Sequence, residues 1–324
     1  MSIEGRVGGY NAVWLENELL RVGVLPEKGA DIFEIIYLPD RLQLLMKSPA
    51  GLRPRPEKEP ADFLENYEGG WQELFPNHGD PCEMDDQTIP MHGEVALLPW
   101  EALELQENDS ETSLRLQVRC RKTPFVLERL MRLRSGEARL EILERVTNGS
   151  DEQREFVWGH HLTLGEAFLK EGSQLEVDAK TIWTPDPVFE PKTARLAAGQ
   201  VSSWPQARGR DGKLVDLQLI PGREAHSHDD AYLTGLKRGH FQVTSPQAGL
   251  RFSLDWDEKV FPWVTLWQPY GGAELPPLTG IYGVGIEPWV SRLSLAEAIQ
   301  KGEARTLAGK QSLDTRLTAS IVKL

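Results

Sequence analysis

Short segments in which apolar and polar residues alternate run through most of the chain. From Ser113 to Cys120 every second residue is apolar, the signature of a strand with one face in the core and the other in water. Segments of similar strand-like character occur at 20–25, 32–38, 125–133, 138–146, 217–220, 241–244, 250–255, 263–267 and 318–322. The pattern predicts many short strands.

Helical signals are few. Ser294 and Glu297 have the Ser-x-x-Glu spacing of a capping box, and Gly302 stands where a helix of about two turns would end. Asp62 to Tyr67 could hold one more turn. The range 47–60 is rich in proline and charge and predicts a long surface loop rather than a linker between domains.

Many strands with few helices indicate a mainly β protein. We expect a large antiparallel two-sheet β-sandwich with a few short helices. The length of 324 residues suits two domains or one large β domain. Because no internal repeat or composition shift marks a boundary, we expect residues 1–324 to form a single domain.

The charge balance narrows the choice of partners. There are 36 Lys and Arg against 49 Asp and Glu, a net charge of −13 that repels phosphate backbones, so we expect no nucleic acid partner. No apolar run approaches the roughly 18 residues of a membrane span, and the N-terminus lacks the layout of a secretory signal. We therefore expect a cytoplasmic protein with no membrane partner; nothing specifies its oligomeric state.

Metal and cofactor motifs are absent from the sequence. Cys82 and Cys120 are the only cysteines, too few for a disulfide framework or a multi-cysteine metal site. His226 and His228 form a His-x-His pair, but in what reads as a polar loop such a pair is more often solvated. Rossmann and P-loop fingerprints do not occur. We expect no metal and no cofactor.

Four segments place unusual polar groups inside strand-like, aromatic sequence: 69–79, 90–94, 156–165 and 282–289. In the last of these, Glu287 lies in an apolar, glycine-rich run. A carboxylate there must find a partner or raise its pKa, which makes Glu287 a candidate base. Taken singly, each segment also has a structural explanation, such as a histidine that satisfies a hydrogen bond in the core.

Taken in order, the motifs resemble those of the aldose 1-epimerase (galactose mutarotase-like) family. They are Phe75-Pro76, His92-Gly93, His161 with Leu164 three positions later, Asp229 with Tyr232 three positions later, and Glu287-Pro288. The resemblance covers about residues 69 to 290. It implies a large antiparallel β-sandwich and interconversion of the α and β anomers of a free monosaccharide, a small carbohydrate substrate.

The resemblance also implies roles for individual residues. Glu287 would remove the proton of the anomeric hydroxyl, and His161 would protonate the ring oxygen. His92 would be a second imidazole near the ring oxygen, and Asp229 would accept hydrogen bonds from sugar hydroxyls. His160 competes with His161 for the acid role, but adjacent residues on a strand face opposite sides, so only one can line a pocket.

Other residues beside these motifs are candidate substrate contacts. Galactose-type members carry an arginine near the Phe-Pro segment, where this chain has Asn77, His78 and Gly79. We therefore take Asn77 as a contact and expect a sugar that differs from galactose or glucose. Trp71 and Trp158 could stack on a sugar ring or belong to the core.

Two other classes of function fit the same fold. A non-catalytic carbohydrate-binding β-sandwich would keep Asp229 and the tryptophans without needing Glu287 and His161 together. A glycoside hydrolase or lyase would pair carboxylates, for example Glu287 with Glu94 or Asp229. The combination of a histidine with a glutamate favours epimerisation.

Overall fold

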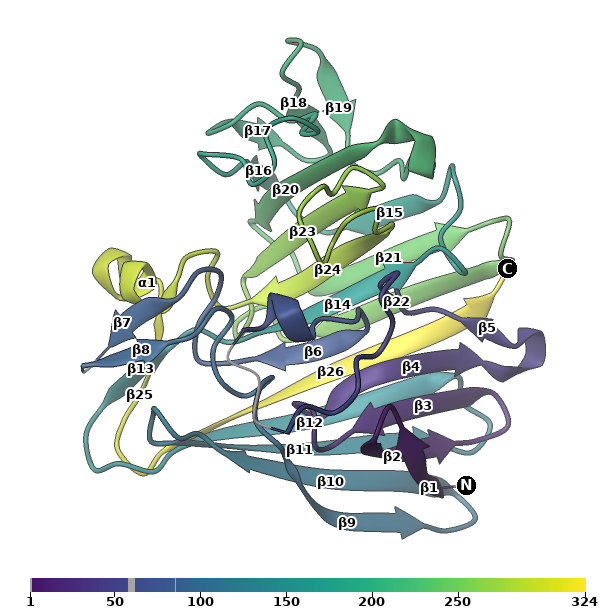
Figure 1. Cartoon of the computed structure of the whole chain (residues 1–324), viewed down its shortest axis with the longest axis vertical. Helices are drawn as coiled ribbons and strands as arrows, with labels where there is room; N and C mark the ends of the chain where they lie inside the picture. Colours follow the sequence, from purple (N-terminus) through teal and green to yellow (C-terminus); the bar gives the residue numbers. More distant parts are fainter. Residues whose placement is uncertain (1, 58–61, 85) are drawn as a thin grey trace.

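The structure is a computed structural model that describes residues 2–57, 62–84 and 86–324. Two large antiparallel sheets form its two layers (Figure 1). In spatial order, the twelve-stranded sheet consists of β1 (Ser2–Val7), β2 (Tyr10–Glu16), β3 (Leu20–Leu25), β4 (Asp31–Tyr37), β6 (Trp71–Leu74), β14 (Gly159–Gly165), β24 (Gly283–Trp289), β23 (Trp263–Tyr270), β20 (Ser227–Thr234), β16 (Thr181–Trp183) and β17 (Val201–Ser203), with β5 (Leu42–Gln43) paired to β4. The eight-stranded sheet consists of β15 (Gln174–Val177), β21 (Gly239–Ser245), β22 (Leu250–Trp256), β26 (Ser312–Lys323), β12 (Arg139–Asn148), β11 (Phe125–Arg134), β10 (Glu111–Arg119) and β9 (Glu101–Glu107).

Smaller elements surround the two sheets. Three strand pairs are β7 (Cys82–Met84) with β8 (Gln87–Ile89), β13 (Arg154–Phe156) with β25 (Arg305–Leu307), and β18 (Gln206–Arg208) with β19 (Leu214–Asp216). Helix α1 (Leu295–Lys301) lies beside β7, and single 3-10 turns occupy η1 (Leu38–Asp40), η2 (Leu64–Asn66) and η3 (Arg223–Ala225). No helix in the described ranges is long and apolar enough to cross a bilayer.

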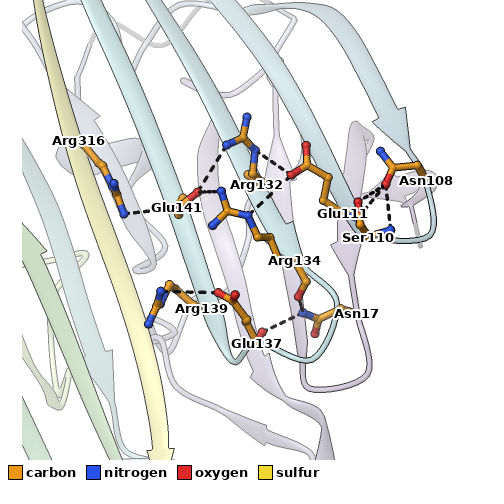
Figure 2. Close-up of polar contacts among 10 residues, drawn as sticks. All are labelled: Asn17, Asn108, Ser110, Glu111, Arg132, Arg134, Glu137, Arg139, Glu141 and Arg316. Carbon is orange, nitrogen blue, oxygen red and sulfur yellow. Dashed lines mark hydrogen bonds and ion pairs between the residues drawn. The ribbon is translucent and has the colours of Figure 1, made fainter.

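Strand alternation builds the core between the layers. Along β11 buried residues strictly alternate with half-buried ones, and buried apolar side chains from both large sheets form one continuous cluster. A smaller separate cluster of Tyr10, Ala12, Leu25 and Phe33 belongs to the twelve-stranded sheet. The outward positions carry charge instead. Figure 2 shows Glu141 of β12 accepting from Arg316 of β26 at 2.8 Å and pairing with Arg134 of β11 at 3.0 Å. One face of the eight-stranded sheet is therefore apolar and the other is ion-paired.

A buried ion network crosses from one sheet to the other. Arg129 of β11 donates from Nη2 to Glu73 of β6 at 2.6 Å and from Nε to Glu144 of β12 at 3.0 Å. All three side chains are 3% exposed or less. Burial raises the pKa of Glu73 to about 7 and also raises the pKa of Glu144, so both carboxylates depend on Arg129 for their charge.

The predicted mainly β, two-sheet architecture is confirmed. Helix α1 begins at the predicted capping box, and Gly302 ends it with a φ of 67°. The strand predicted at 217–220 is wrong, because Asp216 Oδ1 accepts from the backbone N–H of Gln218 and the chain turns. The polar loop expected around His226 to His228 is also wrong at Ser227 and His228, which begin β20.

The loop predicted at 47–60 agrees with the structure where it can be compared. Residues 48–57 contain neither helix nor strand, and 58–60 lie outside the described residues. The turn expected at Asp62 to Tyr67 contains η2, where Asp62 Oδ1 accepts from the backbone N–H of Leu64 at 2.7 Å.

Candidate active site

A cavity of about 430 Å³ lies on the face of the twelve-stranded sheet that points away from the eight-stranded sheet. Its floor consists of side chains from four neighbouring strands: His161 of β14, Glu287 of β24, Thr265 and Trp267 of β23, and Asp230 and Tyr232 of β20. Register aligns them, because Glu287 is paired with Thr265 and Thr265 with Tyr232. Strand alternation thus gives these strands a core face and a cavity face.

Glu287 is buried at the floor with two partners. Its Oε1 lies 3.4 Å from His161 Nε2, and its Oε2 accepts from Trp289 Nε1 at 3.1 Å. Burial raises the pKa of Glu287 well above its ordinary value. Gly285 makes room for this carboxylate, since a Cβ at that position would stand 2.7 Å from Glu287 Oε1.

His161 meets Glu287 from the neighbouring strand. Its Nδ1 lies 3.3 Å from Thr163 Oγ1, which in turn is 3.0 Å from the hydroxyl of Tyr67. Burial, together with the nearby His92, lowers the pKa of His161 to about 3. These shifts favour a protonated Glu287 beside a neutral His161, a pair that shares one exchangeable proton.

His160 faces the opposite way, as the alternation requires. Its Nε2 lies 3.0 Å from Glu144, and its Nδ1 accepts from Trp71 Nε1 at 3.2 Å. Trp158 donates to Glu73 at 2.8 Å in the same network. The three side chains are in the core and not at the cavity. His160 therefore does not compete with His161 for the acid role, and Trp71 and Trp158 belong to the core, the alternative to stacking on a sugar ring.

His92 lines the cavity, and glycine sets its position. His92 itself has a φ of 58°, and a Cβ at Gly93 would stand 2.1 Å from the carbonyl oxygen of Phe75. His92 Nδ1 accepts from the backbone N–H of Gly79 at 3.2 Å, so the neutral ring carries its hydrogen on Nε2. Burial lowers the pKa of His92 to about 4, which favours that neutral form.

His78 lines the cavity where the sequence suggested its neighbour. Its Nε2 is 3.3 Å from Thr265 Oγ1, and burial lowers its pKa well below the ordinary value. Asn77 is a structural residue instead: its amide donates to the carbonyl oxygen of Asp80, and its Oδ1 accepts from the backbone N–H of Leu295 at the start of α1. A buried amide with its hydrogen bonds satisfied has none left for a sugar.

The adjacent aspartates of β20 also differ from expectation. Asp229 points into the core, where its carboxylate accepts from Arg195 Nε at 2.7 Å and from the backbone N–H groups of Arg195 and Leu196. Asp230, on the other face, lines the cavity, and burial raises its pKa to about 6. The sequence signal that separates them is the phase of β20, since Tyr232 lies on the same face as Asp230.

The tryptophan that lines the cavity is Trp267, which the motifs did not reveal. Its Nε1 donates to His228 Nε2 at 2.6 Å, and His228 Nδ1 then donates to Glu190 at 2.7 Å. Glu190 also accepts from the backbone N–H groups of Glu274 and Leu275. This chain of hydrogen bonds fixes both Trp267 and the segment after β16, whose residue Phe189 stands at the cavity.

Residues suited to holding a metal are not grouped in the described ranges, where no three His, Cys, Asp or Glu side chains come together in a suitable cluster. What the cavity offers chemically is a Glu–His pair able to exchange a proton, two further neutral imidazoles, and a carboxylate on the β20 side. Such groups suit acid–base chemistry on a small molecule rich in hydroxyls.

Comparisons with solved structures identify the fold. The galactose mutarotase-like protein of Clostridium acetobutylicum is 12% identical with a TM-score of 0.68, covering 100% of this chain and 99% of that one. A Klebsiella pneumoniae protein with a provisional assignment as an aldose 1-epimerase is 16% identical with a TM-score of 0.73, covering 97% and 80%. The Slr1438 protein of Synechocystis sp. PCC 6803 is 18% identical with a TM-score of 0.70, covering 97% and 96%.

Sequence comparison adds the family. Among curated proteins no significant match to this chain is found. The family model described as "Domain of unknown function (DUF4432)" matches residues 7–321, nearly the whole length. Because this match spans nearly the whole chain, the protein, which has a galactose mutarotase-like fold and a Glu–His pair in the cavity of its larger sheet, belongs to the DUF4432 family.

Proposed function

We propose that this protein is an aldose 1-epimerase-like isomerase that interconverts the α and β anomers of a free monosaccharide. The observation that carries the proposal is the contact between His161 Nε2 and Glu287 Oε1 at 3.4 Å inside the cavity. Mutarotation needs one group to take a proton from the anomeric hydroxyl and another to protonate the ring oxygen. A buried pair that shares a single proton supplies both.

The Glu287–His161 pair holds the same number of protons before and after the reaction. Neutral His161 with protonated Glu287 and imidazolium His161 with ionised Glu287 hold the same number of protons. In the ionised form Glu287 takes the proton of the anomeric hydroxyl, the C1–O5 bond breaks as C1=O1 forms, and His161 protonates O5. The pair is then neutral. After rotation about C1–C2, ring closure on the other face reverses both transfers.

Neighbouring residues would position the sugar against Glu287 and His161. The Nε2–H of neutral His92 has no hydrogen-bond partner among the residues that the structure describes, which suits a contact to the ring oxygen. Asp230 takes the role of hydroxyl acceptor that the sequence suggested for Asp229, whose carboxylate is already occupied by Arg195. Trp267 offers an aromatic surface against which a pyranose can pack.

The two carboxylate pairs considered for the glycosidase alternative, Glu287 with Glu94 and Glu287 with Asp229, do not meet in the cavity. Glu94 is 3% exposed and accepts from the backbone N–H groups of Arg121 and Lys122 and from the hydroxyl of Thr123. Asp229 is bound to Arg195 in the core. Neither lines the cavity with Glu287.

Glu287→Gln tests the proposal, because the amide keeps the shape of the side chain but cannot take the hydroxyl proton. NMR exchange spectroscopy on a panel of aldoses should show catalysed anomer interconversion by wild type and a near-spontaneous rate for the variant. Glu128→Gln, an outward residue of β11, is the matched control and should keep full activity. Sugar binding without catalysis by wild type would identify a carbohydrate-binding protein instead.

The histidine doublet gives a second, independent comparison. His161→Asn should lower turnover by about 10²–10⁴-fold, the usual effect of losing a general acid or base. His160→Asn should lower the free energy of unfolding and leave most of the turnover, since His160 contacts Glu144 and Trp71 in the core. The opposite pattern would contradict the assignment of the acid.

A further inference from the structure

We infer that Thr163 and Tyr67 are positioning residues that keep a hydrogen on Nδ1 of His161, so that Nε2 is the nitrogen that exchanges its proton with Glu287 and with the sugar. Their two hydroxyls form a relay behind the Glu–His pair. The inference rests on the proposed function and adds to the same site two residues that act through His161.

The relay starts on the side of the His161 ring that faces away from Glu287. His161 and Thr163 are two positions apart on β14 and therefore share a face of the strand, which brings Nδ1 within 3.3 Å of Thr163 Oγ1. Thr163 Oγ1 is in turn 3.0 Å from the hydroxyl of Tyr67. The imidazole thus has one nitrogen toward a carboxyl group and the other toward a chain of two hydroxyls.

Both hydroxyls belong to buried side chains. Thr163 is 0% exposed and Tyr67 4%. The ring of Tyr67 packs against those of Phe63 and Trp267, with centroids 5.5 and 5.8 Å away. Within the described ranges, Thr163 Oγ1 contacts only His161 and Tyr67, and the Tyr67 hydroxyl contacts only Thr163. Because buried polar groups need partners, these contacts constrain where each hydrogen can point.

The hydrogens of the relay can point in either of two directions. If the ring hydrogen is on Nδ1, His161 donates to Thr163 and Thr163 donates to Tyr67. In the reverse direction Tyr67 donates to Thr163, Thr163 donates to Nδ1, and the hydrogen of the neutral ring is on Nε2. The direction of the relay therefore determines the tautomer of His161.

The neighbouring carboxyl group selects the first direction. Burial raises the pKa of Glu287 and lowers the pKa of His161, so the resting pair is a carboxylic acid beside a neutral imidazole. Glu287 Oε2 accepts from Trp289, which leaves Oε1, 3.4 Å from Nε2, to carry the acid hydrogen. A hydrogen on Nε2 would clash with that hydrogen, whereas an unprotonated Nε2 accepts it.

The proposed reaction needs the same arrangement at every step. His161 gives the Nε2 proton to O5 and later takes it back, so Nδ1 has to keep its hydrogen throughout. Thr163 accepts from Nδ1 in both the neutral and the imidazolium form. Because a hydrogen bond from a charged donor is the stronger one, Thr163 stabilises the form that protonates O5. Tyr67 lines the cavity, and its own hydrogen is left for a sugar hydroxyl.

NMR measures the tautomer without sugar and without turnover. Long-range proton–nitrogen correlation spectra at pH 8 distinguish a hydrogen on Nδ1 from one on Nε2, and His161→Asn assigns the signal. Wild-type His161 should match His228, whose hydrogen is on Nδ1 because Trp267 donates to its Nε2. In Thr163→Val it should match His92, whose hydrogen is on Nε2. A hydrogen on Nε2 of His161 in the wild-type protein would overturn the inference.

Thr163→Val keeps the shape of the side chain but removes the acceptor for Nδ1–H. We expect kcat to fall about 10- to 100-fold, the usual effect of losing a hydrogen bond to a charged group, and KM to stay within about twofold. Thr163→Ser restores the hydroxyl and should recover most of kcat. Thr315→Val is the matched control, a buried threonine of β26 in the other sheet, and should keep the wild-type kcat.

Tyr67→Phe tests the far end of the relay. Without the phenol oxygen, the hydrogen of Thr163 has only Nδ1 of His161 as an acceptor. The ring hydrogen should therefore move to Nε2, as in Thr163→Val. An unchanged tautomer in Tyr67→Phe would remove Tyr67 from the relay.

The outcomes separate this inference from the proposed function. A hydrogen on Nδ1 that Thr163→Val moves to Nε2, in a protein without turnover, would support the relay and contradict the isomerase. Turnover by wild type with an unchanged kcat in Thr163→Val would support the isomerase and overturn the relay. Equal losses of kcat in Thr163→Val and Thr163→Ser would also overturn the relay, since packing and not the hydroxyl would then be responsible.

Discussion

Gly285 controls the position of the Glu287 carboxylate, because an added Cβ would stand 2.7 Å from Oε1 and 3.1 Å from the Cβ of Trp267. Gly285→Ala should therefore displace the carboxylate from His161. A misplacement of about 1 Å can lower turnover about 10²-fold. Anomer exchange should fall by that order, while urea denaturation shows a free energy of unfolding within about 1 kcal/mol of wild type. Full activity of the variant would show that Glu287 does not need its present position.

Residues with unusual chemistry in apolar sequence were the ones that could be predicted. Glu287 and His161 stand out because a carboxylate or an imidazole among glycines and aliphatic residues needs a special reason to be there. Asp230 and His78 could not be separated from Asp229 and Asn77 in this way, since each pair consists of adjacent polar residues. For the two aspartates the phase of β20 decides, and it can be used only once Tyr232 is known to face the cavity. For Asn77 and His78 the path of the loop decides, which a single sequence leaves open.

At the scale of one element, β20 places a stabilising and a destabilising aspartate side by side. The pKa of Asp230 is raised from 3.8 to about 6, so the folded protein holds a proton there that the unfolded chain releases above about pH 4. The contribution of Asp230 to stability is complete below pH 3.8 and is lost as the pH rises through about 6. The buried, ionised carboxylate of Asp230 therefore lowers the free energy of unfolding at neutral pH.

Asp230→Asn should reverse that loss. Urea denaturation should give a free energy of unfolding about 1–3 kcal/mol above wild type at pH 8 and little difference at pH 4, while sugar binding weakens. Asp229→Asn is the control on the core face and should destabilise at pH 8, because Arg195 loses its ion pair. Equal stability of Asp230→Asn and wild type at pH 8 would contradict the raised pKa.

Elements differ in how much of them the sequence predicts. Strands with one wet face, such as β10 and β11, show clean alternation and are predicted almost to the residue. The strands that carry the site do not, since every residue of β14 and of β24 is buried. The cavity face of these strands is closed by loops and neighbouring aromatic rings, so the period-two signal is lost where the chemistry lies.

At the scale of the whole molecule, Arg129 ties the two sheets together by ion pairs to Glu73 and Glu144. Arg129→Met should leave two buried carboxylates without a cation and lower the free energy of unfolding by about 3–5 kcal/mol in urea denaturation at pH 7. Arg132→Met removes ion pairs of the outward face on the same strand and should cost about 1 kcal/mol or less. Similar losses in the two variants would show that burial of the network does not matter.

The composition of the fold could be predicted, but its arrangement could not. Counting strand-like segments leads to a two-sheet sandwich, because each needs a second apolar face to cover it. Which strands pair with one another could not be predicted. β14 lies between β6 and β24, more than eighty residues before it and more than one hundred after it, and no local signal specifies such pairings.

Because His160 and His161 of β14 point in opposite directions, every residue of the strand is tied to one face by its position in the sequence. A point substitution alters one face at a time, but inserting or deleting a single residue before His160 would exchange the two faces throughout the strand. After a deletion, His161 would occupy the position that meets Glu144 in the core, and after an insertion, His160 would occupy the position that meets Glu287. As such a chain diverges, its surface loops can change in length, whereas β14 can accept substitutions but no insertion or deletion.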